Sequence, residues 1–133
     1  INRVRIRFQT PTELKGNTFT ADAPLFSVLF ARIRDRVSLL ASLYGTGLPD
    51  VDFAELGRTA AAVECVTSTL RVAGTSRRSA RTGQVHWLGG LVGEAVYTGP
   101  LKDLMPFLRV AEYVGVGRHT AWGNGEILVC PEG

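Results

Sequence analysis

The sequence has no hydrophobic run long enough to cross a lipid bilayer. Its longest apolar stretches lie around Leu25–Phe30 and Leu88–Val92, far short of the ~20 residues that a spanning helix needs. Its 15 glycines follow no fixed period, which excludes a collagen-like or repeat architecture. A hydrophobic fraction of 45% in 133 residues also excludes an intrinsically disordered chain. The sequence therefore describes a globular domain with one core.

The sequence also lacks a secretory signal, an initiator methionine and any metal-binding spacing. No basic and apolar start resembles a signal peptide, and a strand pattern begins directly after Ile1. We therefore expect a cytoplasmic protein and a fragment of a longer chain. Cys65 and Cys130 have no partner cysteine or histidine pair at the spacing of a zinc site. We expect two buried, reduced thiols that are not bonded to each other, no metal and no cofactor.

Acidic residues are missing from one segment of the chain. The net charge is only +3, but residues 65–93 contain four arginines and no Asp or Glu, which gives that segment a charge of +4. All but two of the 15 basic residues are arginine, whose planar guanidinium can bind phosphate through two hydrogen bonds. A base composition that favours arginine codons is an equally good explanation of that ratio. The segment without acids is the better indication of an anionic partner.

The spacing of apolar residues predicts four strands, two long helices and one short helix. Val4, Ile6 and Phe8 alternate with polar residues, as in a strand with one buried face. Steps of three and four mark the long helices, and Asp50 or Asp52 is a candidate cap for the short one. The predicted elements are a strand over 3–9 that ends at Thr10-Pro11, a helix over 24–44, a short helix over 54–63, strands over 66–72 and 88–97, a helix over 101–114, and a strand over 125–130. Pro106 either lies in the first turn of the helix over 101–114 or kinks that helix.

The order of these elements is βαββαβ with one additional short helix. This order is typical of a ferredoxin-like α+β fold, in which two helices pack on one face of a four-stranded antiparallel sheet. The second and third strands form a hairpin, and we expect the polar connection Ala73–Gln84 to be its long, basic tip. The other face of the sheet is left free, as in many nucleic-acid-binding domains.

Glycine is dense in the segment from Gly115 to Gly125, which contains four glycines in eleven residues. Such a segment can adopt positive φ angles and direct successive backbone N–H groups at an anion. It matches neither the P-loop pattern nor the dinucleotide-binding fingerprint. Two interpretations remain open, a phosphate-binding loop and a turn whose glycines are required only by sterics.

The same segment resembles the glycine-rich loop of the RAMP superfamily of CRISPR-associated proteins, which are built on ferredoxin-like domains. It has the form Gly-apolar-Gly, five residues, then Gly-x-Gly before a terminal strand. Together with Ser76–Gln84, Leu88–Glu94 and Arg7–Lys15, it is similar to the C-terminal domain of the CRISPR-associated endoribonuclease that cuts precursor CRISPR RNA within its repeats. Asn124 stands where that family commonly has an apolar residue. The resemblance implies that residues 1–133 are one RAMP domain of a longer, two-domain protein.

The resemblance also implies an activity and a set of contacts. The family cleaves RNA without a metal, by attack of a ribose 2′-hydroxyl on the adjacent phosphate. The histidine that assists this cleavage usually lies in the N-terminal domain. We therefore expect this fragment alone to be inactive. His119 is the one candidate for a catalytic residue in it. The alternative is that His119 only forms hydrogen bonds to the loop or to RNA. The expected RNA contacts are Arg77, Arg78, Arg81, Gln84, His86, Gly115, Gly117, Arg118, His119, Gly123 and Gly125.

Four aromatic residues are candidates for stacking on unpaired bases: Trp87, Trp122, Tyr97 and Tyr113. We expect core packing for most of them, with Trp87 or Trp122 reaching RNA. The expected partners are CRISPR repeat RNA, other CRISPR-associated subunits and a second copy of the chain, with no membrane. The main alternative is a non-catalytic RAMP subunit that holds guide RNA in an effector complex. A third possibility is a domain that assembles with proteins through its sheet.

Overall fold

The computed structural model describes residues 2–14, 23–43, 52–78, 85–117 and 125–132, and it describes the side chains of these residues except 40–43, 74–78 and 85–89. Four strands and three helices form these parts of the chain. Their bounds are β1 Arg3–Thr12, α1 Phe26–Leu43, α2 Phe53–Ala61, β2 Glu64–Arg78, β3 Val85–Thr98, α3 Met105–Val114 and β4 Ile127–Glu132.

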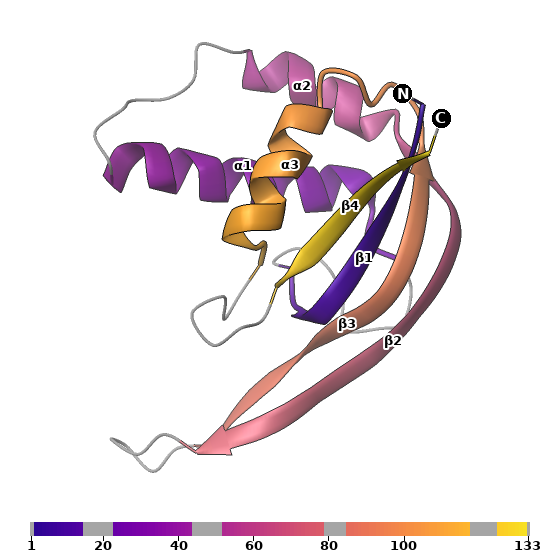
Figure 1. Ribbon diagram of the computed structural model, residues 1–133. Coiled ribbons are helices and arrows are strands. Elements are labelled where there is room, and N and C mark those ends of the chain that lie inside the picture. The colour runs from indigo at the N-terminus through magenta and orange to yellow at the C-terminus, as the bar shows by residue number, and fades with distance from the viewer. Residues whose placement is uncertain (1, 15–22, 44–51, 79–84, 118–124, 133) are drawn as a thin grey trace.

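The four strands form one antiparallel sheet with the order β2-β3-β1-β4. Figure 1 shows the helices together on one face of this sheet, while the described residues leave the other face open. The order and the layers confirm the predicted ferredoxin-like α+β fold. They also place β2 and β4 at opposite edges, so Cys65 and Cys130 are far apart and both thiols are free.

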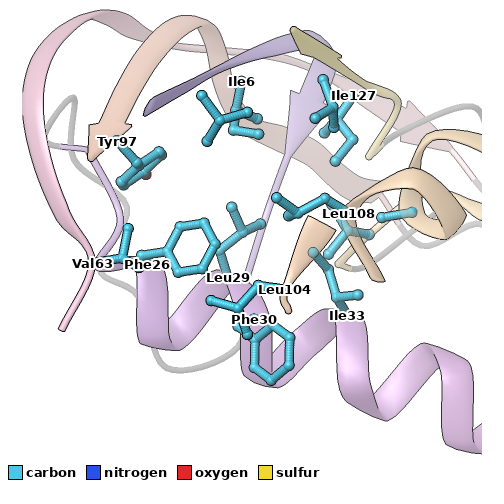
Figure 2. Packing of buried hydrophobic residues seen from close by; sticks show 14 of the residues in the cluster. Ile6, Phe26, Leu29, Phe30, Ile33, Val63, Tyr97, Leu104, Leu108 and Ile127 are labelled. Carbon is cyan, nitrogen blue, oxygen red and sulfur yellow. The ribbon is translucent and has the colours of Figure 1, made fainter. Parts of the chain in front are cut away.

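The core lies between the sheet and the helices. Figure 2 shows Ile6 and Ile127 on the sheet side of this core, and Leu29, Leu104 and Leu108 on the helix side. All five side chains are at most 2% exposed, and burial of each contributes ~1.5–3 kcal/mol to folding. The alternating apolar residues of the strands and the three- and four-residue steps of the helices therefore meet in one cluster, as the sequence predicts.

Local capping signals set the ends of the helices. The Asp52 carboxylate accepts a hydrogen bond of 3.1 Å from the backbone N–H of Glu55 and caps α2, so Asp52 and not Asp50 is the N-cap. Pro106 lies in the first turn of α3, where its missing N–H costs nothing. The turn residues Leu101–Leu104 precede that helix, which therefore begins later than predicted.

The strand β1 continues through Thr10-Pro11 to Thr12, where the sequence predicts its end. Its register against β3 shifts between Phe8 and Thr12, so Pro11 falls in the irregular part of the pairing, where its missing N–H is tolerated. The Pro11 carbonyl instead accepts a hydrogen bond from the backbone N–H of Gly125. The prediction was wrong because a proline can be accommodated where regular pairing is interrupted.

The hairpin of β2 and β3 is longer than predicted. Residues 73–78, assigned from the sequence to a polar tip, pair with residues 85–90 as far as Arg78 opposite Val85. Figure 1 shows this two-stranded ribbon projecting beyond the end of β1. A projecting ribbon is stabilised by its backbone hydrogen bonds and needs no alternating apolar face, so its sequence carries no strand pattern.

Cys65 is exposed and not buried as predicted. It lies in the edge strand β2, whose first residues Glu64–Thr69 are all exposed, while Cys130 in β4 is half-buried. Among the described helices, none is long and apolar enough to span a membrane.

Candidate functional site

The open face of the sheet carries a network of ion pairs. Arg5 donates hydrogen bonds to Glu94 at 2.8 Å and to Glu132 at 3.1 Å. Arg7 donates two hydrogen bonds to the same Glu94 oxygen, at 2.7 and 3.0 Å. The bond from Arg7 is the main cause that lowers the pKa of Glu94, and the bond to Glu132 is the main cause that raises the pKa of Arg5.

These ion pairs make Arg5 and Arg7 poor contacts for phosphate. The guanidinium groups of Arg5 and Arg7 already hold carboxylates, so a phosphate must compete with Glu94 and Glu132 for them. No exposed aromatic side chain of the described residues lies in the sheet to stack on a base. The free face predicted for a nucleic acid is present, but two of its arginines, Arg5 and Arg7, are paired with carboxylates of the protein.

The ribbon of β2 and β3 carries the predicted basic residues. Arg71 is exposed near its base, opposite Val92. Further out, Arg77 in β2 pairs directly with His86 in β3, and Arg78 follows. The structure therefore brings Arg77 and His86 to directly opposite positions of the two strands, although they are nine positions apart in the sequence. Arg81 and Gln84 lie outside the described residues.

Two glycines in β3 permit close packing of the ribbon against its neighbours. A Cβ at Gly90 would collide with the backbone of Thr12 in β1, and a Cβ at Gly93 would collide with the Thr69 carbonyl in β2. Gly93 also has a φ of +119°. The close approach of the β1 backbone explains Gly90, the second glycine of the Gly89-Gly90 pair. A protein backbone and not a ligand fills the space.

The glycines at the described ends of the glycine-rich segment have positive φ angles. Gly115, Gly117 and Gly125 have φ values of +78°, +86° and +80°, a region that other residues enter with strain. Gly115 ends α3, and its N–H bonds to the Ala111 carbonyl at 2.9 Å. A Cβ at Gly117 would collide with the carbonyl oxygen of Glu13. Helix termination and packing therefore explain these two glycines without a ligand.

Hydrogen bonds join the two ends of this segment to the end of β1. The Val116 N–H donates to the Gly125 carbonyl at 2.9 Å, and the Gly125 N–H donates to the Pro11 carbonyl at 3.0 Å. The Glu126 N–H donates to the Thr10 hydroxyl at 2.9 Å. The base of the segment is therefore fixed to the scaffold. Arg118, His119 and Gly123 lie outside the described residues, as does Asn124.

The segment begins and ends at the same end of the sheet from which the ribbon projects (Figure 1). Sequence reasoning found both features but missed their common support, which is the irregular end of β1 at residues 10–13. The Thr10-Pro11 pair was a signal for it, since a proline inside a strand pattern indicates a bulge or an edge.

The stacking candidates separate clearly. Tyr97 is fully buried, and its hydroxyl donates a hydrogen bond of 2.8 Å to the Pro24 carbonyl; burial raises the pKa of this hydroxyl. Tyr113 is 90% exposed, so the expectation that it packs in the core was wrong. The side chain of Trp87 and the whole of Trp122 lie outside the described residues.

A ferredoxin-like domain with a basic ribbon and an anchored glycine-rich segment at one end of its sheet defines a RAMP-type domain. The sequence model of the family "CRISPR-associated endoribonuclease Cas6" matches residues 6–127. The chain therefore belongs to the Cas6 family of CRISPR-associated endoribonucleases. No curated protein sequence matches it.

Several solved Cas6 structures have the same fold as this chain. It is similar to a Thermus thermophilus Cas6, with a TM-score of 0.70 and 18% identity over 96% of this chain and 53% of that one. A Cas6 product complex gives a TM-score of 0.68 and 20% identity over 97% and 51% of the two chains. A chain of a partial Cas6-RT-Cas1–Cas2 complex gives 0.67 and 19% over 96% and 22%. The chain spans about half the length of the first two structures.

Proposed function

We propose that this chain is the RNA-binding domain of an endoribonuclease that cleaves precursor CRISPR RNA within its repeats. One observation carries the proposal: a chain of the Cas6 family presents its basic ribbon and the fixed base of its glycine-rich segment at the same end of the sheet. Phosphates would contact Arg77, Arg78 and the other arginines predicted for the ribbon and the segment. The cytoplasm is the compartment that this function requires.

The proposed cleavage is an attack of a ribose 2′-hydroxyl on the adjacent phosphate. It leaves a cyclic phosphate and a free 5′-hydroxyl, and it requires a base, an acid and a donor for the charge that develops on the phosphate. Arginines of this domain would supply the donor and hold the phosphate in place. His119 is the candidate base or acid within the chain, and a histidine in another part of a two-domain protein is the other source.

The alternative function is that of a RAMP subunit that holds guide RNA and does not cut it. Such a subunit needs only cations and backbone donors.

The deciding experiment is incubation of the full-length protein with its own repeat RNA in excess chelator. Cleavage that yields a cyclic phosphate and a 5′-hydroxyl supports the endoribonuclease and its independence from metal. Tight binding without cleavage, with or without added divalent metal, supports the guide-holding subunit. Absence of any salt-sensitive binding contradicts both and favours assembly with proteins through the sheet.

A further inference from the structure

Tyr113 is an aromatic side chain without a structural role in the described part of the protein. It lies on the outer side of α3 and is 90% exposed. Every other aromatic side chain that the structure describes is buried or half-buried: Phe8, Phe26, Phe30, Phe53, Tyr97 and Phe107. Three pairs of these rings contact each other edge to face, and Tyr113 belongs to none. An exposed ring of this size adds nothing to the core, and tyrosine is enriched at binding surfaces.

The position of Tyr113 is fixed relative to Gly115, the first residue of the glycine-rich segment. α3 packs on the core through Leu108 and Ala111, which are fully buried. The next residue, Glu112, accepts a hydrogen bond of 2.7 Å from the Val129 N–H of β4. Two residues after the tyrosine, Gly115 ends the helix and begins the glycine-rich segment. The ring therefore stands at the entrance of that segment on a rigid support, and a ligand that uses it orders little of the protein on binding.

The surroundings of Tyr113 favour a nucleobase over a protein surface. Val110, one turn earlier, is 41% exposed and is the only other exposed large apolar side chain in the described part of α3. The neighbouring Arg109 guanidinium donates to Glu112 and to the Val129 carbonyl, each at 3.1 Å. A stable protein interface buries ~800 Å² on each partner, much more than these two apolar side chains present. A single unpaired base needs only one ring face.

We infer that the Tyr113 ring stacks on an unpaired base of the RNA whose phosphates approach the glycine-rich segment. The inference rests on the proposed function, and it adds a contact that recognises bases without reading their sequence, because every base has a flat π-face. The phenol hydroxyl has no part in the stack, so phenylalanine would serve equally well. The contact requires a single-stranded stretch of RNA beside α3, since a base inside a duplex cannot reach the ring.

The test compares Tyr113→Ala and Tyr113→Phe with the parent chain. The probe is a single-stranded RNA dodecamer that carries the fluorescent base 2-aminopurine at each position in turn, because its emission is quenched by stacking. Leu25→Ala is the matched control, since Leu25 is another exposed apolar residue, at 70% exposure, next to α1. Melting curves of all variants should coincide, because neither side chain is buried.

We expect Tyr113→Ala to weaken binding of the dodecamer at least five-fold, about 1 kcal/mol, and to abolish quenching at one position. Tyr113→Phe and Leu25→Ala should keep both properties. If Tyr113→Ala binds and quenches like the parent, the stacking inference is wrong while the proposed function stands. Loss in Tyr113→Phe equal to that in Tyr113→Ala also overturns stacking, because the hydroxyl would then be the contact. A parent chain that binds no RNA contradicts the proposed function and this inference together.

Discussion

The carboxylate of Glu112 in α3 accepts a hydrogen bond of 2.7 Å from the backbone N–H of Val129 in β4. Arg109, one turn earlier, donates to the Val129 carbonyl at 3.1 Å and to Glu112 at 3.1 Å. β4 is an edge strand that pairs only with β1. Two side chains of a helix therefore occupy the positions that the backbone of a further strand would take, and they protect this edge against pairing with another chain.

We expect Glu112→Ala to lower the free energy of unfolding by ~1–3 kcal/mol, because it leaves a partly buried backbone donor without a partner. The Glu112 side chain is only 17% exposed, so water replaces the carboxylate poorly. Urea denaturation measures the effect. Glu55→Ala is the control, since Glu55 forms an i,i+3 pair with Arg58 in which both side chains are more than 60% exposed, and such a pair contributes less than ~1 kcal/mol. Equal losses in both variants would contradict the protection of the edge.

A second prediction concerns Gly117. Its φ of +86° and the nearby Glu13 carbonyl both oppose a side chain, so Gly117→Ala should destabilise the fold by ~1–3 kcal/mol from strain alone. Gly57 in α2 is the contrasting position, because a Cβ there meets no atom within 4 Å. Gly57→Ala should therefore raise stability by ~0.5–1 kcal/mol. Thermal melts of the two variants should shift in opposite directions, and a stable Gly117→Ala protein would refute the steric explanation.

Gly123 lies outside the described residues, and the expectation for it stays a prediction from the sequence. If this glycine has a positive φ beside RNA, Gly123→Ala in the full-length protein should weaken repeat-RNA binding at least ten-fold, about 1.4 kcal/mol, with a cooperative fold retained. Filter binding and a melting curve check the two parts. A variant that binds and processes RNA like the parent would show that this part of the segment is only a turn.

The ion pairs on the open face of the sheet predict a dependence of stability on pH. The pKa of Glu94 is lowered in the folded state, chiefly by Arg7, so its contribution is complete above its ordinary pKa of 4.5. The contribution is lost as the pH falls through the lowered value. Glu94→Gln should therefore lose less stability on acidification below pH 4.5 than the parent.

The matched control for this pH effect is Glu64→Gln, because Glu64 is exposed in β2 and forms no ion pair among the described residues. Denaturation at a series of pH values compares the three proteins. If the free energy of unfolding falls equally with pH in the parent and in Glu94→Gln, this carboxylate does not contribute to the acid dependence of stability.

The ribbon and the glycine-rich segment predict RNA binding that depends steeply on salt. If Arg77, Arg78, Arg81 and Arg118 each neutralise one phosphate, the slope of log affinity against log salt is about −3 for single-stranded RNA. Arg81→Ala should reduce that slope by roughly 0.7. The control is Arg58→Ala, since Arg58 lies in α2 and pairs with Glu55, and its slope should equal that of the parent. An unchanged slope in Arg81→Ala would show that the tip of the hairpin does not contact the RNA.

The sequence by itself determined the elements, their order and several of their ends. Apolar residues alternate in β1 and recur every three or four residues in α1 because those side chains are buried. This pattern can be recognised within a short stretch of the chain. Asp52 and Pro106 act within one helical turn, so their roles could also be predicted from neighbouring residues. The RAMP-type fold then follows from the order of elements, because few arrangements bury these faces in one core.

The tertiary structure alone decided which polar groups meet. Arg5 and Glu94 are 89 residues apart in the sequence, and no local pattern indicates that they form an ion pair. The length of the ribbon depends on backbone pairing, which leaves no trace in side-chain polarity. Tyr113 is exposed because the fold leaves solvent beside it. A glycine is required at position 117 because the Glu13 carbonyl lies across from it. Such contacts join distant parts of the chain, so only the folded arrangement determines them.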